Sequence, residues 1–176
     1  MAGCISEPTM STEQTEPAPE RALITSRREY VDAVTRVLGL ARHEIRIFDP
    51  DLADIGLNNE EATRLLHQFF VRSRTQRLFI AVHDTGFVAK RAPHLMRLLG
   101  TFSGNMLIHK TQGDAARVQD CFALADEEHF VRRKVAQQAR GAVYMNDPKE
   151  ARGMRERFDE IWESSYLAVS ASTVGL

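Results

Sequence analysis

The feature that most constrains this fold is an uninterrupted apolar run, Leu78–Val82, in the middle of the chain. A short run of this kind, without a polar position, is typical of a strand that is covered on both faces of its sheet. Glu44–Phe48 and Met106–Ile108 are also read as strands, and segments with helical spacing precede and separate the three. This alternation predicts an α/β fold in which helices connect parallel strands.

Capping residues indicate where the helices begin. Ser26–Glu29 is a capping box, Asn59–Glu61 places an amide cap before two acidic residues, and Asp147–Glu150 combines an aspartate cap with a proline in the first turn. A further helix is expected over Ala89–Leu99, with its end at Gly100. Each predicted helix carries apolar residues at the spacing that places them on one face.

The pattern changes near residue 120. Cys121–Ala125, His129–Arg132 and Ala142–Met145 are three short strand-like segments with no helical pattern between them. Closely spaced strands of this kind pair in antiparallel fashion. The expected fold class is therefore α/β, with a mixed sheet sandwiched by helices, central parallel strands and antiparallel strands late in the chain.

Composition separates a leader from the rest of the chain. Residues 1–20 hold three prolines and four glutamates but no lysine, arginine or aromatic residue, which predicts a disordered acidic leader rich in Pro, Ser and Thr. Residues 21–176 are expected to form a single domain. Only two cysteines, Cys4 and Cys121, are present, and neither a signal peptide nor a membrane span is visible. A cytoplasmic location is therefore expected.

The charge balance limits the classes of partner. The formal net charge is −1, which argues against a protein that holds nucleic acid or an anionic membrane by bulk charge alone. A local basic patch remains compatible with this balance. Arg132, Arg133, Lys134 and Arg140 are close in sequence, and such a group suits either a phosphate site or a solvated face.

The order of the segments resembles one half of the phospholipase D superfamily. Ile24–Ala41 is similar to its opening helix, Glu44–Phe48 to its first strand, Cys121–Asp126 to the end of its His-x-Lys-x4-Asp motif, and Phe158–Glu163 to its closing helix. The resemblance is to small bacterial members with a degenerate motif. It implies the α/β fold given above and also a homodimer, because single-motif members of the superfamily pair two copies to complete one site.

The resemblance also implies that catalysis has been lost. With Asp126 as the anchor, Gln119 stands at the histidine position and Cys121 at the lysine position. The superfamily uses that histidine as the nucleophile that forms a phosphohistidine, and glutamine cannot replace it. The Gly-Ser-x-Asn segment is absent, and the chain has basic residues in that region. These departures predict a binding or interaction module without a cofactor, whose ligand is a phosphate-containing molecule or a protein partner.

A second enzyme hypothesis starts from Asp49 and Asp51, which directly follow a predicted strand. This Asp-x-Asp pattern resembles the haloacid dehalogenase phosphatases, in which the first aspartate attacks phosphorus, the second is the acid and base, and Mg²⁺ lies between them. Ala53 departs from that pattern. Asp-Pro-Asp is also an ordinary turn sequence, and a third hypothesis is a structural domain that works in an assembly.

The ends of the central strands are the expected position of a ligand, because ligands of open α/β sheets bind outside the carboxyl ends of parallel strands. Asp49, Asp51, His83 and Asp84 all follow such ends. They form either a cation-binding cluster or a network of caps and turns. The candidate ligand-binding residues, with no metal site among them, are Asp49, Asp51, Asp84, Asp126, Arg132 and Arg133.

Overall fold

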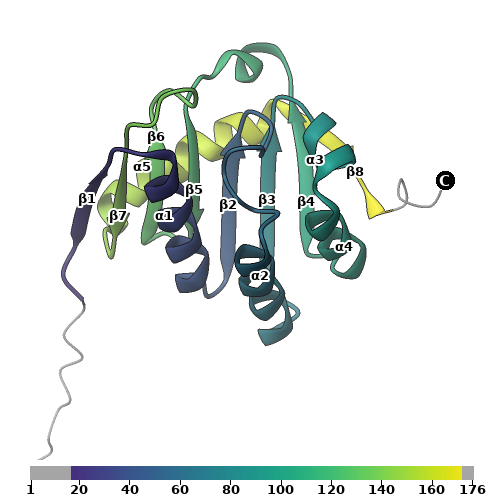
Figure 1. Cartoon of the computed structure of the whole chain (residues 1–176), viewed down its shortest axis with the longest axis horizontal. Coiled ribbons are helices and arrows are strands. Elements are labelled where there is room, and N and C mark those ends of the chain that lie inside the picture. Colours follow the sequence, from purple (N-terminus) through teal and green to yellow (C-terminus); the bar gives the residue numbers. More distant parts are fainter. Residues whose placement is uncertain (1–16, 172–176) are drawn as a thin grey trace, which may run out of the picture.

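The computed structural model describes residues 17–171 and contains one mixed eight-stranded sheet with helices on both faces (Figure 1). The strands are β1 (Glu20–Ile24), β2 (Glu44–Asp49), β3 (Arg77–Val82), β4 (Met106–Thr111), β5 (Cys121–Ala125), β6 (His129–Arg133), β7 (Gly141–Met145) and β8 (Ser165–Val169). Their order across the sheet is β1-β7-β6-β5-β2-β3-β4-β8. The adjacent strands β2, β3 and β4 are parallel, and all other pairs are antiparallel. The predicted fold class is confirmed.

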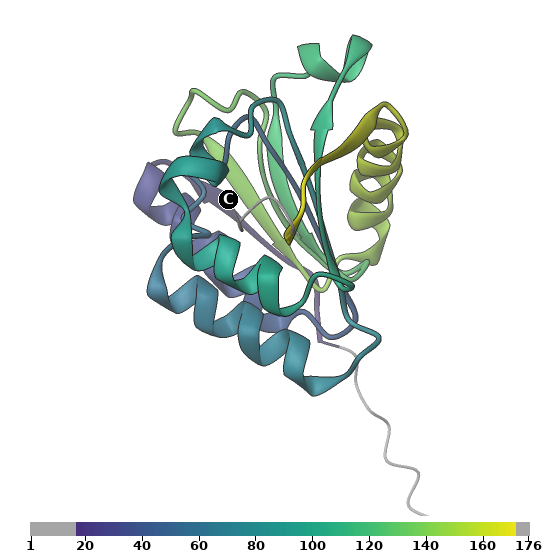
Figure 2. The same ribbon diagram turned by 90° about the vertical axis from the view of Figure 1, so that its right-hand side faces the viewer.

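Helices form a layer on each side of the sheet (Figure 2). The helices are α1 (Arg27–Leu40), α2 (Glu60–Arg72), α3 (Gly86–Arg91), α4 (Pro93–Thr101) and α5 (Pro148–Glu163), and a 3₁₀ turn, η1, covers Gly113–Arg117. The first four helices cover one face, and α5 lies alone across the other. The central strands are therefore covered on both sides, as the apolar run in β3 predicts, whereas the edge strands β1 and β8 are largely exposed.

Side-chain size on β5 differs between the two faces. Cys121, Ala123 and Ala125 belong to the core beneath α1–α4, whereas Phe122 and Leu124 belong to the core beneath α5. Successive strand residues point to opposite faces, so this alternation separates two apolar cores. The small residues let α1 approach the sheet closely.

The three helix starts predicted from capping residues are confirmed. Ser26 accepts a hydrogen bond from Glu29 N, Asn59 from Ala62 N, and Asp147 from Glu150 N. The single helix expected over Ala89–Leu99 is instead two helices, α3 and α4, which meet at Ala92. Pro93 explains the break, because proline lacks an N–H donor and disfavours the helical conformation of the preceding residue.

Both ends of the described chain add strands to the sheet. Residues 1–16, which make up most of the expected leader, lie outside the described residues. Glu20, the last residue assigned to that leader, instead opens β1, where it pairs with Met145 and binds Arg36. At the other end, β8 pairs with β4 in a segment that gave no strand signal. Within residues 17–171, no helix is long and apolar enough to cross a membrane.

Candidate functional site

The carboxyl ends of β2 and β3 lie side by side, as the sequence predicts. Register pairs Asp49 with Val82, the last residues of the two strands. The carbonyl oxygen of Pro50 accepts hydrogen bonds of 2.9 Å from both His83 N and Asp84 N, which ties the two strand ends together. Four polar residues from the sequence prediction therefore gather at one edge of the sheet.

Their side chains are used as caps and turns. Asp49 Oδ1 accepts hydrogen bonds from Asp51 N (3.2 Å) and Leu52 N (2.7 Å). Asp51 accepts from Ala53 N, and the exposed Asp84 accepts from Gly86 N, both at 2.9 Å. In the described part of the chain, no group of three or more His, Cys, Asp or Glu side chains is placed to hold a metal ion. Of the two readings of this cluster, the structure favours the network of caps and turns.

The ring of His83 is fixed between two partners. Its Nδ1 lies 2.6 Å from Thr111 Oγ1, and its Nε2 lies 2.7 Å from the carbonyl oxygen of Val118. The ring also packs edge-on against Phe48. Since both ring nitrogens are engaged within the protein, this imidazole is not presented as a nucleophile.

A buried cluster surrounds Cys121, the residue that the sequence resemblance places at the lysine position. Cys121 Sγ accepts a hydrogen bond from Tyr30 OH (3.4 Å) and another from Arg133 Nε (3.3 Å). The guanidinium of Arg133 lies over the Tyr30 ring, 4.1 Å from its centre, and Arg133 is only 1% exposed. Burial raises the pKa of the Cys121 thiol and the pKa of the Tyr30 phenol, so both groups are held neutral. Gln119, at the histidine position, is exposed, and its carbonyl oxygen accepts from Ala136 N.

A cavity of about 160 Å³ opens beside this cluster, between Asp49, Arg133 and residues of two loops. Asp49 is 1% exposed, and its Oδ2 has no hydrogen-bond partner. Burial raises the pKa of Asp49 to about 6. Arg27 and Asp54 form an ion pair of 3.1 Å among the residues that line this space. The cavity is smaller than the roughly 300–1,000 Å³ of typical ligand pockets.

Asp126 lies at the opposite edge of the sheet, so the structure does not bring it together with the other candidate residues. Because β5 runs antiparallel to β2, its last residues meet the beginning of β2. The Asp126 carboxylate accepts hydrogen bonds from Arg42 N (2.8 Å), His43 N (2.8 Å) and Glu44 N (3.0 Å). These bonds make Asp126 an anchor for the connection between α1 and β2.

The basic residues near position 133 are divided between the two faces. Arg133 points into the core beneath α1, whereas Arg132 and Lys134 point to the α5 face, because alternate residues of a strand face opposite ways. The grouping of Arg132 and Arg133 into one site is therefore wrong.

On the α5 face, Arg132 has a partner that the sequence did not indicate. Asp120, only 2% exposed, accepts hydrogen bonds from Nε and Nη2 of Arg132 and from Nε and Nη2 of Arg157 in α5. These bonds raise the pKa of Arg157. Asp120 is the residue between Gln119 and Cys121, and strand alternation was the one signal that could have placed it on this face.

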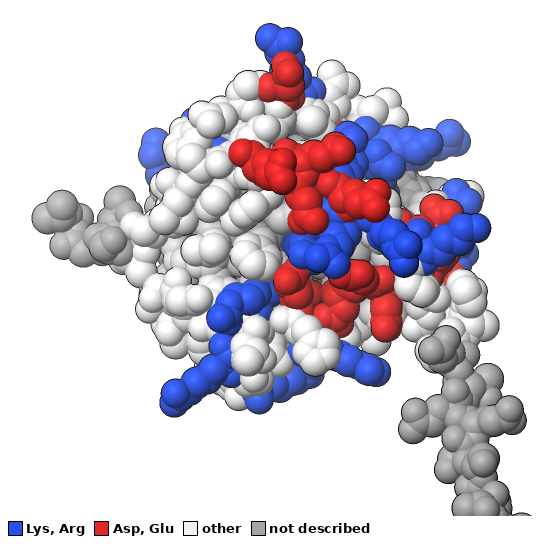
Figure 3. Space-filling model, turned by 180° about the vertical axis from the view of Figure 1, so that it is seen from behind, with Lys and Arg blue, Asp and Glu red and all other residues white. Residues whose placement is uncertain are grey.

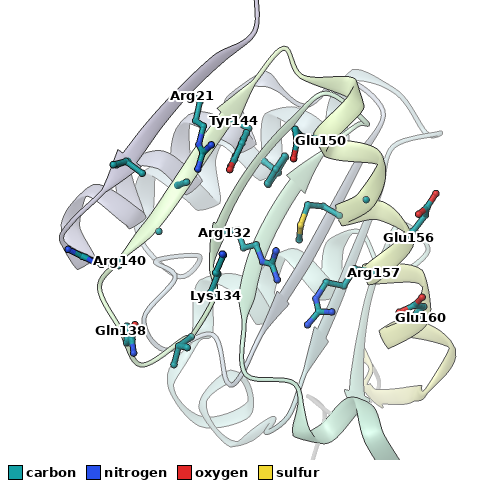
Figure 4. A pocket seen from close by; sticks show the side chains of 17 residues that line it. Arg21, Arg132, Lys134, Gln138, Arg140, Tyr144, Glu150, Glu156, Arg157 and Glu160 are labelled. Carbon is teal, nitrogen blue, oxygen red and sulfur yellow. The ribbon is translucent and has the colours of Figure 1, made fainter.

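A groove of about 690 Å³ runs along this face between α5 and the strands β1, β7 and β6 (Figure 4). Lysine and arginine side chains from both walls line it, together with the apolar residues Phe130, Ala142 and Met154. Figure 3 shows charged side chains of both signs gathered on this side of the molecule, beside a broad area with neither. The groove is larger than the cavity beside Asp49. The sheet separates it from the cluster of Tyr30, Cys121 and Arg133.

A family model described as a domain of unknown function, DUF7931, matches residues 26–170. Among curated proteins, none matches the chain in sequence.

Solved structures resemble the fold at low sequence identity. Nuc of Salmonella typhimurium, a phospholipase D family member, has a TM-score of 0.59 at 14% identity, with 87% of this chain and 100% of that chain covered. NucT from Helicobacter pylori has a TM-score of 0.60 at 12% identity, with 86% and 100% covered. TrmBL2, an archaeal chromatin protein described with a mode of DNA binding, has a TM-score of 0.61 at 13% identity. The match covers 90% of this chain and 57% of TrmBL2.

These likenesses establish the architecture. The fold is phospholipase D-like, in agreement with the resemblance of the sequence segments. Since the family model covers most of the chain, the chain belongs to the DUF7931 family.

Proposed function

We propose that this protein is a non-catalytic phospholipase D-like module that binds a phosphate-containing ligand. The observation that carries the proposal is the buried cluster around Cys121, in which the thiol and the Tyr30 phenol are both neutral. Cys121 stands where the resemblance requires a lysine, and its Sγ accepts hydrogen bonds from Tyr30 OH and Arg133 Nε. Phosphodiester cleavage of this type needs an imidazole nucleophile and a cation for the phosphate oxygens. Gln119 supplies no nucleophile, and His83 is engaged on both nitrogens.

The phosphatase alternative requires Asp49 to reach phosphorus with Mg²⁺ beside it. Asp49 is almost fully buried, and its Oδ1 is committed to the turn that follows β2. Asp51 accepts from Ala53 N instead of lying against a shared metal position. This geometry favours binding over phosphoryl transfer.

One turnover assay separates the binding module from the enzyme hypotheses, and thermal stabilisation by phosphate compounds separates it from the structural domain. Purified full-length protein is incubated with 4-nitrophenyl phosphate and with bis(4-nitrophenyl) phosphate, each with Mg²⁺ and with EDTA, beside an Asp49→Asn variant. The proposal expects no turnover in any arm. Metal-independent cleavage of the diester would refute it, and monoester cleavage that EDTA and Asp49→Asn both abolish would establish the phosphatase. A structural assembly domain would show neither turnover nor stabilisation by phosphate compounds.

Two features of the proposal concern partners. The homodimer that the resemblance implies is tested by light scattering on the full chain, where a monomer mass at all concentrations would refute it. Nucleic acid is a ligand to test because TrmBL2 is described as a DNA-binding protein, although the net charge of −1 argues against strong non-specific binding. A cytoplasmic location is part of the same proposal.

A further inference from the structure

The groove between α5 and the β1–β7–β6 edge of the sheet is organised by a buried carboxylate. Asp120 holds Arg132 and Arg157 together, with its Oδ2 accepting from both guanidiniums at 2.8–3.0 Å. Arg132 and Arg157 are 30% and 38% exposed. Each uses its Nε and Nη2 on Asp120, which leaves Nη1 to meet a ligand. The two cations are thus preorganised, and a ligand that binds them does not have to order them.

Basic residues outnumber acidic residues in the lining of the groove, with five lysine and arginine residues against three glutamates. Lys134 is exposed, follows directly after the end of β6 and lines the groove with Arg132 and Arg157, so three cations lie in its lining beside the buried Asp120. Figure 4 shows Arg132 and Arg157 directed toward each other across the groove. Glu150, Glu156 and Glu160 of α5 also line it, and Glu160 contributes to the raised pKa of Arg157. Arginine and lysine in this arrangement match the oxygens of a phosphate group, which accept several charge-assisted hydrogen bonds at once.

The floor of the groove is built from two rows of side chains across the strands. One row is Arg21, Tyr144 and Phe130, and the other is Leu23, Ala142 and Arg132. Tyr144 is stacked on Phe130 at 4.4 Å between ring centres, and Arg21 covers its other face at 5.0 Å. Since both faces of the Tyr144 ring are occupied, the floor does not offer it for base stacking. It offers a short apolar surface beside the cations.

Small residues keep the groove open at this point. Ala142 lies between Leu23 and Arg132 in its row, and Gly153 lines the opposite wall on α5. A Cβ built on Gly153 would meet no atom within 4 Å, so no neighbouring side chain requires a glycine there. Glycine in a helix interior is unfavourable relative to alanine. Packing therefore does not explain Gly153, whereas its lack of a side chain leaves the groove open.

We infer that this groove binds an organic phosphate monoester, with the phosphate on Arg132, Arg157 and Lys134 and an apolar body over Ala142 and Gly153. The inference rests on the proposed binding function and names its site and ligand class. The volume of about 690 Å³ lies within the range of small-molecule pockets. The site is on the face of the sheet opposite the cluster of Tyr30, Cys121 and Arg133.

Isothermal titration calorimetry of the full chain with phenyl phosphate tests the inference. Inorganic phosphate, which lacks the apolar body, and benzyl alcohol, which lacks the phosphate, are the comparison ligands. Phenyl phosphate is expected to bind more tightly than either. Lys134→Gln should weaken its affinity about tenfold, the effect of losing one charge-assisted hydrogen bond. Gly153→Leu should abolish binding by filling the groove, while it leaves the unfolding midpoint at or above that of the wild type. Lys90→Gln, the same charge change at an exposed residue of α3, should bind as the wild type.

The results that would overturn the inference differ from those that would overturn the proposed function. Absence of heat with phenyl phosphate at millimolar concentration would exclude the groove as the site. Wild-type affinity in both Lys134→Gln and Gly153→Leu would exclude it as well. Loss of binding in Arg27→Gln alone would place the ligand in the small cavity and would also refute the inference. Turnover of an aryl phosphate would refute the non-catalytic proposal, yet it would leave the titration result for the groove intact.

Discussion

Asp126 provides a quantitative test of the structural anchor at the beginning of β2. Its carboxylate accepts three backbone hydrogen bonds, and its own N–H donates to Glu44 O at 2.8 Å. Its backbone has φ of +54°, a region that asparagine and aspartate tolerate better than most residues. Asp126→Ala removes all three acceptors and also places an alanine in the left-handed region.

The expected cost follows from these contacts. Each hydrogen bond contributes about 1 kcal/mol, and the left-handed backbone costs alanine about 1 kcal/mol, which gives about 4 kcal/mol for Asp126→Ala. Asn keeps an oxygen for His43 N and Glu44 N and loses only the bond from Arg42 N, so Asp126→Asn should cost about 1 kcal/mol.

Urea unfolding followed by far-ultraviolet circular dichroism measures both variants against the wild type. Asp114→Ala is the matched control, because its carboxylate is fully exposed and pairs only with Arg117 at 3.7 Å, so its effect should stay below about 0.5 kcal/mol. If Asp126→Ala costs no more than this control, the carboxylate is not an anchor. If Asp126→Ala and Asp126→Asn lower the free energy of unfolding equally, the Asp126 oxygen shared by His43 N and Glu44 N does not contribute to stability.

Three further predictions concern the core and the site. Because burial raises the pKa of Asp49 to about 6 from 3.8, the folded state binds the proton more tightly than the unfolded chain, so stability falls as pH rises from about 4 to about 6. In urea unfolding, the free energy of unfolding of Asp49→Asn relative to that of the wild type should therefore rise by about 3 kcal/mol between pH 4 and pH 7. If the two free energies change with pH in parallel, the prediction is wrong. Gly153→Ala should raise the free energy of unfolding by about 0.5–1 kcal/mol, and a decrease would mean that the glycine is required by packing. Phe158→Ala should cost about 3–5 kcal/mol, because the ring is 1% exposed and stacks on Trp162; a loss below about 1 kcal/mol in the same assay would contradict this packing.

Local sequence patterns predicted most of the elements because local physics specifies them. The caps at Ser26, Asn59 and Asp147 satisfy helix N–H groups from within three residues, and the apolar run in β3 reflects burial on both faces. The edge strand β8 gave little signal, because its residues are largely exposed and its pairing partner is about 60 residues away in the sequence.

The candidate site was predicted only in part, since it depends on contacts between distant segments. The sequence placed Asp49, Asp51, His83 and Asp84 at one edge, because the ends of neighbouring parallel strands meet there. It could not show that their side chains are used in turns, because that depends on the path of the loop after β2. It also treated Arg132 and Arg133 as one group, although strand alternation sends them to opposite faces.

The sequence by itself determined the α/β class and the starts of α1, α2 and α5, because residue identity and spacing specify them. Only the tertiary structure decided which distant side chains meet. Arg133 reaches Tyr30 from about 100 residues away, and Asp120 joins Arg132 on β6 to Arg157 on α5. Side chains that are far apart in the chain meet only when the sheet and its two helix layers are assembled, so no local pattern could specify those contacts.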